Sequence, residues 1–122
     1  MKYIADTQIK KQIDILIERL HFDHIVAKQV FCIRSFDAKT RAYARIWGMS
    51  PIFKEVAKIE PTYIIEVNNR QYEKLPPREK IKTLIHELMH IPKTFSGALL
   101  SHRGRYHRIN DREVEKILNS LS

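Results

Sequence analysis

The sequence predicts a single small α+β domain. Three observations lead to this prediction: 122 residues of which 43% are hydrophobic, two amphipathic segments with helical periodicity, and two segments rich in β-branched and aromatic residues. This length and apolar content allow one compact core over residues 1–122. Cys32 is the only cysteine, so neither an internal disulfide nor a cysteine-rich zinc site can form.

The first half of the chain predicts a helix followed by two strands. Residues 8–20 carry apolar side chains at helical spacing behind a candidate N-cap, Thr7, which indicates an amphipathic helix against the core. Residues 29–36 have the continuous apolar character of a buried strand. Residues 41–49 alternate in a way that favours a second strand, and Ser50 and Pro51 suit the start of a short helix.

The second half predicts a strand and two helices. Residues 61–68 are the strongest predicted strand, either an edge strand that could pair with an extended peptide or an interior strand. Residues 77–91 carry an apolar stripe between a proline pair and Pro92, which predicts a helix. A last helix is expected from residue 102 or 110 to residue 121.

The stretch His86-Glu87-Leu88-Met89-His90 lies inside the helix predicted over residues 77–91. His86 and His90 are four residues apart and share one helical face, so two imidazoles could bind one metal ion beside Glu87. This pattern predicts a zinc metallopeptidase, in which zinc acidifies a bound water and Glu87 takes its proton as general base. The alternative interpretation is two surface histidines with an accidental glutamate between them.

A catalytic zinc ion needs a third protein ligand. The downstream candidates are His102, His107, Asp111, Glu113 and Glu115. His107 is preferred because Asp111 follows it by four residues and could accept a hydrogen bond from its distal nitrogen. His102 remains the alternative ligand. The donor for the developing oxyanion could be Tyr106, His102 or an arginine of residues 103–108.

The chain is basic, with a formal net charge of +8 at pH 7. The lysines and arginines are spread along the chain, so a solvated surface is expected rather than a nucleic-acid partner. The alternative function is a basic, DNA-associated zinc protein similar to the SprT-like proteins. No apolar run approaches the roughly 20 residues of a membrane span, and residues 1–6 lack the apolar core of a signal peptide, so we expect a cytoplasmic protein without a membrane partner.

Residues 82–107, which contain both His86-Glu87-Leu88-Met89-His90 and His102, resemble the minigluzincins. These are minimal metallopeptidases of about this size, similar to the catalytic domains of integral-membrane gluzincin peptidases. The resemblance implies a gluzincin-like minimal zincin domain: a small mixed β-sheet with a backing helix, an active-site helix and a C-terminal helix. It also implies one catalytic Zn²⁺, a peptide or protein substrate and a histidine as third ligand, which matches His107 with Asp111 behind it.

The resemblance has a further implication for the C-terminal segment. Known minigluzincins are latent, because their C-terminal segments cover the cleft. By this resemblance, residues 108–122 could cover the site as in a zymogen. They could do so in a neighbouring subunit, which would imply a homodimer or a higher homo-oligomer formed through the C-terminal helix.

Overall fold

The computed structural model describes residues 2–104 and 108–121, which form one mixed β-sheet with helices packed against it. The sheet has the strand order β1-β2-β4-β3. Its strands are β1 (Lys2–Ala5), β2 (Val30–Phe36), β3 (Ala44–Trp47) and β4 (Tyr63–Asn68). Strands β2 and β4 are parallel, whereas β1 and β3 pair antiparallel at the two edges. This architecture confirms the predicted α+β class.

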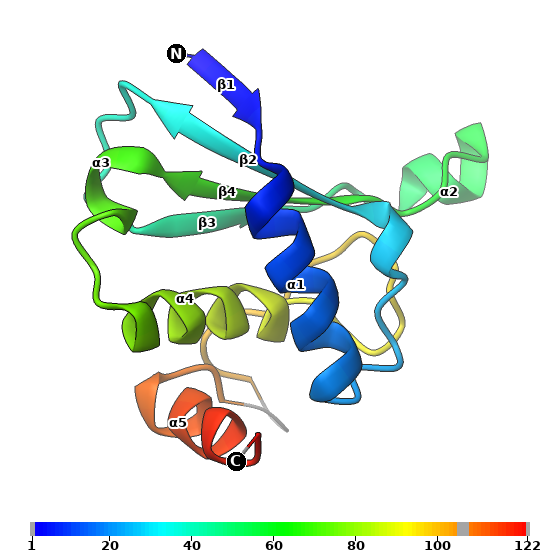
Figure 1. Ribbon diagram of the computed structural model, residues 1–122. Coiled ribbons are helices and arrows are strands. Elements are labelled where there is room, and N and C mark those ends of the chain that lie inside the picture. The colour runs from blue at the N-terminus through cyan, green and yellow to red at the C-terminus, as the bar shows by residue number, and fades with distance from the viewer. Residues whose placement is uncertain (1, 105–107, 122) are drawn as a thin grey trace.

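The core lies between one face of the sheet and two long helices, α1 (Thr7–Arg19) and α4 (Pro77–Met89). Figure 1 shows α4 lying along the sheet, with α5 (Asp111–Asn119) beyond it on the far side. The core-facing residues alternate along the strands and recur at helical spacing along the helices, as the two periodicities require. They include Ile9, Ile13, Val30, Cys32, Tyr63, Ile65, Val67, Leu84, Ile85 and Leu88.

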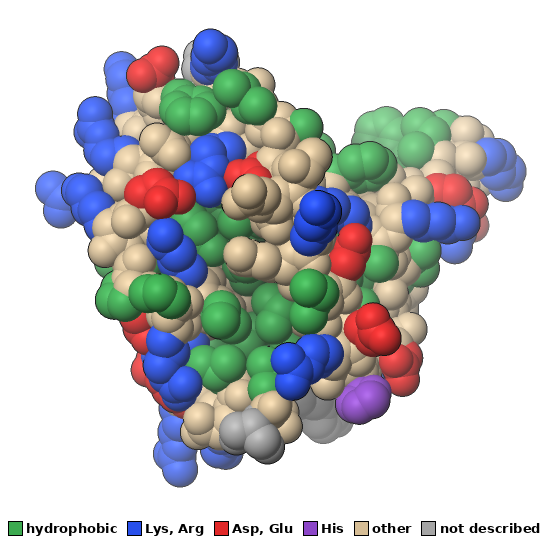
Figure 2. All heavy atoms as spheres, viewed as in Figure 1, with side chains coloured by type: hydrophobic (Ala, Val, Ile, Leu, Met, Phe, Trp, Pro, Cys, Tyr) green, Lys and Arg blue, Asp and Glu red, His purple; other side chains and the backbone are tan. Residues whose placement is uncertain are grey.

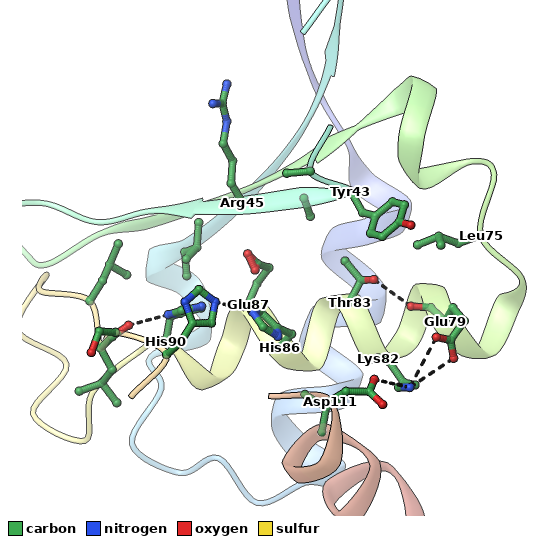
Figure 3. Close-up of a pocket in the computed structure, with 18 residues that line it drawn as sticks. Tyr43, Arg45, Leu75, Glu79, Lys82, Thr83, His86, Glu87, His90 and Asp111 are labelled. Carbon is green, nitrogen blue, oxygen red and sulfur yellow. Dashed lines mark hydrogen bonds and ion pairs between the residues drawn. The ribbon is translucent and has the colours of Figure 1, made fainter. Parts of the chain in front are cut away.

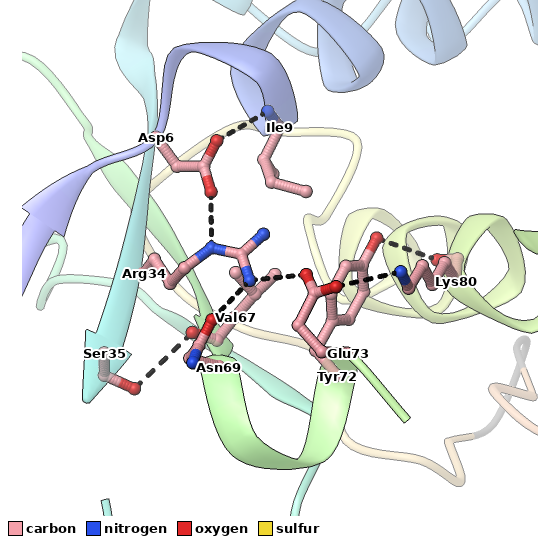
Figure 4. A network of polar contacts seen from close by, with 9 residues as sticks. All are labelled: Asp6, Ile9, Arg34, Ser35, Val67, Asn69, Tyr72, Glu73 and Lys80. Carbon is pink, nitrogen blue, oxygen red and sulfur yellow. Dashed lines mark hydrogen bonds and ion pairs between the residues drawn. The ribbon is translucent and has the colours of Figure 1, made fainter. Parts of the chain in front are cut away.

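The start of α1 differs from the sequence prediction by one residue, because Asp6 and not Thr7 is the N-cap. The Asp6 carboxylate accepts a hydrogen bond from the N–H of Ile9 at 3.0 Å, which satisfies an open donor of the first turn. Its second oxygen accepts from Arg34 Nε at 2.8 Å. Arg34 also donates to the side chains of Asn69 and Glu73, at the two ends of the short helix α3 (Asn69–Tyr72). The guanidinium on β2 thus links the start of α1 to α3 (Figure 4).

The strand over residues 61–68 is interior, since β4 has β2 on one side and β3 on the other. The edge-strand alternative for this segment is therefore wrong. The edge beside β4 is β3, which the alternation of residues 41–49 predicted as a strand. The strand with an open backbone edge on this side of the sheet is therefore the short strand β3 and not the apolar strand β4.

The described chain has two further α-helices and a short 3₁₀ helix, Ala27–Gln29, directly before β2. Helix α2 (Ile52–Ala57) lies between β3 and β4, where the sequence predicted a short helix after Ser50. Helix α5 begins after Asn110, whose side chain accepts a hydrogen bond from the N–H of Glu113 at 3.0 Å. Val114 and Leu118 of α5 are buried in the common core.

Positive charge is not concentrated on the face of the molecule that Figure 2 shows. Figure 2 shows lysine and arginine side chains at several separate places on one face, with acidic side chains between them. Among the described residues, no helix combines the length and the apolar character that a membrane crossing demands.

Candidate metal centre

Three histidines converge at the C-terminal end of α4. His86 and His90 come from one face of the helix, as their spacing predicts, and the loop that follows α4 brings His102 to them. Their candidate ligand atoms all lie within 4.8 Å of one another. The Nε2 atoms of His86 and His102 are 3.2 Å apart.

The distance between the His86 and His102 nitrogens fits two ligands of a tetrahedral metal ion. Zinc–nitrogen bonds of about 2.0 Å at tetrahedral angles place two ligand nitrogens about 3.3 Å apart. The 3.2 Å between His86 and His102 agrees with this value. A donor set made only of imidazoles suits a zinc-like transition metal better than magnesium or calcium, which prefer oxygen ligands.

The orientation of His90 is fixed by the backbone. Its Nδ1 lies 2.6 Å from the carbonyl oxygen of Leu100, so Nδ1 carries the proton and donates, while Nε2 remains available as a ligand. The N–H of Leu100 in turn donates to the carbonyl of His90 at 2.8 Å. This reciprocal pair joins the end of α4 to the loop that carries His102.

A buried tyrosine supports the same loop. Tyr63 on β4 has no exposed surface, and its hydroxyl accepts from the N–H of Gly97 and donates to the carbonyl of Ala98, each at 2.8 Å. Further along, the N–H of Ile109 donates to the carbonyl of His102 at 2.9 Å. Both ends of the segment around His102 are therefore anchored to well-packed parts of the fold.

The burial of the site changes the proton affinities of its groups. Burial raises the pKa of Glu87 to about 8, since its side chain is shielded from water. Burial, with the neighbouring His90 and His102, lowers the pKa of His86 to about 4. His86 is therefore neutral and able to bind a cation at neutral pH, and Glu87 has a strong affinity for a proton.

The three histidines open onto a cleft of about 920 Å³. Strand β3 forms one wall, α4 the floor, and the segment from Leu99 to His102 another wall, with Asp111 and Val114 of α5 at the margin. Figure 3 shows Glu87 and His86 in the middle of the lining residues, His90 to one side of them, and Tyr43, Leu75 and Glu79 on the other side. The histidines and the segment of residues 42–46 therefore line the same cleft.

Strand β3 presents backbone groups along this cleft. The N–H of Asn68 donates to the carbonyl of Tyr43 at 2.9 Å, so this pair is hydrogen-bonded. Because bonded and non-bonded pairs alternate in an antiparallel ladder, Arg45 and Trp47 also direct their backbone groups towards β4. Ala44 and Ile46 direct theirs to the open edge, where an extended chain could pair with them.

The sequence-predicted site residues have different outcomes. His86, Glu87, His90 and the alternative ligand His102 lie together. His107 and Tyr106 lie outside the described residues, so their predicted roles stay predictions.

Asp111 has a described partner other than a histidine. Its Oδ1 lies 2.6 Å from Nζ of Lys82, a lysine whose side chain is only 9% exposed and that also contacts Glu115 at 2.7 Å. These carboxylates raise the pKa of Lys82, which keeps the lysine charged and joins α5 to α4. The support of His107 by Asp111 stays a prediction, since His107 lies outside the described residues.

The predicted latency segment, residues 108–122, contains α5. Because Val114 and Leu118 are buried in the core, α5 is an integral part of the fold as well as a margin of the cleft. Whether the segment regulates access remains a prediction from the resemblance.

Sequence reasoning missed two supporting groups, the Leu100 carbonyl and the Tyr63 hydroxyl. A backbone carbonyl leaves no sequence signal. Tyr63 acts across 34 residues on the chain, and it resembles any other aromatic residue of a buried strand.

Comparison with known proteins gives one result. A family model described as "Putative phage metallopeptidase" matches residues 1–120. No curated protein and no solved structure matches the chain.

Proposed function

The chain belongs to the phage metallopeptidase family, and from this premise we propose that it is a zinc-dependent endopeptidase of the gluzincin type. The observation that carries the proposal is the convergence of His86, His90 and His102 beside the buried carboxyl of Glu87. The resemblance of residues 82–107 to the minigluzincins supports the narrower assignment.

We assign His86 and His90 as two ligands and His102 as the third. The spacing of 3.2 Å between the His86 and His102 Nε2 atoms supports this set, as does the carbonyl that orients His90. His107 is the competing third ligand, supported by the sequence spacing to Asp111. A zinc ion bound here would supply Lewis acidity, which polarises the scissile carbonyl and makes water more acidic.

The residues of the chain would perform the remaining tasks. Glu87 would accept a proton from the attacking water and deliver it to the leaving amine, two transfers that suit a carboxyl whose pKa burial has raised towards neutral pH. The open edge at Ala44 and Ile46 holds the substrate as an added antiparallel or parallel strand over α4. Main-chain pairing of this kind selects an extended peptide and excludes a folded segment.

Metal analysis of purified variants tests the ligand set. We expect one zinc ion per chain in the wild type and loss of zinc in His86→Ala and His102→Ala. His107→Ala should retain zinc if His102 is the third ligand, whereas the reverse result would assign His107. His21→Asn is the matched control, because His21 is exposed and has φ of 56°, a conformation that asparagine tolerates.

Hydrolysis tests the role of Glu87. Glu87→Gln should keep the metal and lower the cleavage of a quenched fluorescent peptide by about 10²-fold or more, the size of a general-base contribution. A zinc-free wild type, or unchanged cleavage by Glu87→Gln, would contradict the proposed function.

A further inference from the structure

An apolar arm extends from the fold between β3 and β4. We define the arm as residues 49–60, which contain α2. Its apolar side chains are exposed to an unusual degree: Val56 by 72%, Ile52 by 61%, Phe53 by 49% and Ile59 by 48%. No residue of α2 is buried. Figure 1 shows α2 projecting from one end of the sheet, and Figure 2 shows hydrophobic side chains on this projection.

The arm contributes little to the core, so its apolar side chains need another explanation. The other long apolar stripes of the chain, on α1 and α4, pack against the sheet. A contiguous exposed apolar patch on a protein surface commonly marks an interaction site. The arm therefore has the character of a binding surface that the fold itself does not cover.

The base of the arm is firmly seated on the loop of the metal centre. The N–H of Met49 donates to the carbonyl of Gly97 at 2.8 Å. A side chain at Gly48 would lie 2.3 Å from that same oxygen and 3.0 Å from Cγ of Leu99, so only glycine fits there. Gly97 has φ of +99°, and a side chain on it would meet the carbonyl of Met49 at 2.6 Å. The position of the arm relative to the cleft is therefore fixed by close backbone contact.

One apolar side chain, Leu99, connects the cleft to the base of the arm. Leu99 lines the cleft and also touches Gly48, and it is 42% exposed. An extended chain advances about 3.3 Å per residue, so a peptide paired with Ala44 and Ile46 would reach the arm within a few residues.

We propose that the arm is an exosite for an apolar, extended segment of the polypeptide substrate, adjoining the residues that pair with β3. The inference rests on the proposed peptidase function and adds a preference for unfolded chains with apolar residues on that side of the cleavage point. The charges of the arm favour this occupant over an anionic surface. Lys54 and Lys58 are balanced by Glu55 and Glu60, so the arm has no net charge to attract lipid headgroups or nucleic acid.

The test measures binding apart from catalysis. All variants carry Glu87→Gln, so the peptide stays intact. The probe is a fluorescein-labelled synthetic peptide with a serine–alanine centre and leucine–valine–phenylalanine blocks at both ends; its control has serine–threonine blocks. The arm variant is Ile52→Ser/Val56→Ser, which changes two exposed residues without changing helix propensity appreciably. Ile15→Ser on α1 is the matched control, because Ile15 is 53% exposed but lies outside the cleft lining.

Fluorescence anisotropy should show about tenfold weaker binding of the apolar-ended peptide to the arm variant, or ~1.4 kcal/mol. Binding of the serine–threonine peptide should not change, and Ile15→Ser should behave as the parent protein. The unfolding midpoint should also be unchanged, since no buried side chain is altered.

Several results would overturn the inference. The first is that the parent protein binds both peptides with equal affinity. The second is that Ile15→Ser weakens binding of the apolar-ended peptide as much as the arm variant does. The third is that the arm variant binds the apolar-ended peptide as tightly as the parent protein. If the last result accompanies loss of self-association in sedimentation, the arm is a contact between copies. If it accompanies loss of phosphatidylglycerol vesicle binding, the arm is a membrane contact. Failure of the wild type to cleave peptides would refute the proposed function separately, since binding is read in the inactive background.

Discussion

Replacing Tyr63 with phenylalanine isolates the contribution of one hydroxyl group to both the fold and the metal centre. The substitution keeps the buried ring and its edge-on contact with Phe95, whose centroid is 5.0 Å away. It removes the partner of the buried Gly97 N–H and of the Ala98 carbonyl. Ala98 is exposed, so its carbonyl can bind water instead, whereas the Gly97 N–H is left buried without a partner.

The expected loss of stability follows from these two contacts. A buried donor without a partner costs about 1–3 kcal/mol, and a replaced hydrogen bond costs less, which together give ~2 kcal/mol. For a chain of this size that loss corresponds to a fall in the melting temperature of about 8 °C. Because the Gly97–Ala98 turn leads to Leu100 and His102, we also expect about tenfold weaker metal binding, as is usual when a supporting hydrogen bond is lost.

Urea unfolding and chelator competition measure these two quantities. Tyr3→Phe is the matched control: Tyr3 is 49% exposed on the distant edge strand β1, and its change should alter stability by less than about 0.5 kcal/mol. The reasoning would be refuted if Tyr63→Phe unfolded at the same urea concentration as Tyr3→Phe. Full stability loss with unchanged metal affinity would refute only the link to the metal centre.

Three further predictions concern the edge strand, acid stability and the metal. Glu66 is buried and its Oε1 accepts from Arg45 Nε and Trp47 Nε1, each at 2.9 Å, so it clamps β3 to β4. In steady-state kinetics, Glu66→Leu should therefore raise KM for a long peptide about three- to tenfold with metal affinity unchanged, and a fall in kcat alone would contradict the clamp. Burial by itself would raise the pKa of Asp6, but hydrogen bonds from the Ile9 N–H and Arg34 lower it below the usual 3.8. A carboxyl with a lowered folded-state pKa stabilises the fold above its unfolded pKa and ceases to do so as pH falls through the folded value. Asp6→Asn keeps a residue that can cap the helix, so it should lower the free energy of unfolding in urea by ~1 kcal/mol at pH 7. Below pH 4, about the unfolded pKa, the loss should become smaller. A difference in stability that persists at pH 2 would contradict the contribution of the ion pair. Removal of the metal with a chelator should lower the free energy of unfolding by ~4 kcal/mol if the ion had been present at about 1,000 times its Kd. Re-added zinc should restore the lost stability. Calorimetric scans that change neither with the chelator nor with zinc would argue against a metal site in the native state.

The sequence-based predictions succeeded where structure is local. The periodicity of α1 and α4 and the β-branched runs of β2 and β4 determine these elements within a few residues. The first strand, β1, was not predicted, because four exposed residues carry no pattern of their own and become a strand only by pairing with β2. The sequence also left open whether β4 is an interior or an edge strand, because an apolar, β-branched segment can occupy either position.

The sequence by itself determined the first half of the metal centre. His86, Glu87 and His90 occupy one region of a helix because residues four apart share a helical face, and this relation holds wherever the helix lies. Only the tertiary structure decided what surrounds them: His102 beside His86, the Leu100 carbonyl behind His90, and the open edge of β3 above the cleft. These relations depend on the path of a loop and on which strands pair. Both are settled by contacts between distant residues, such as Tyr63 with Gly97, that no local pattern encodes.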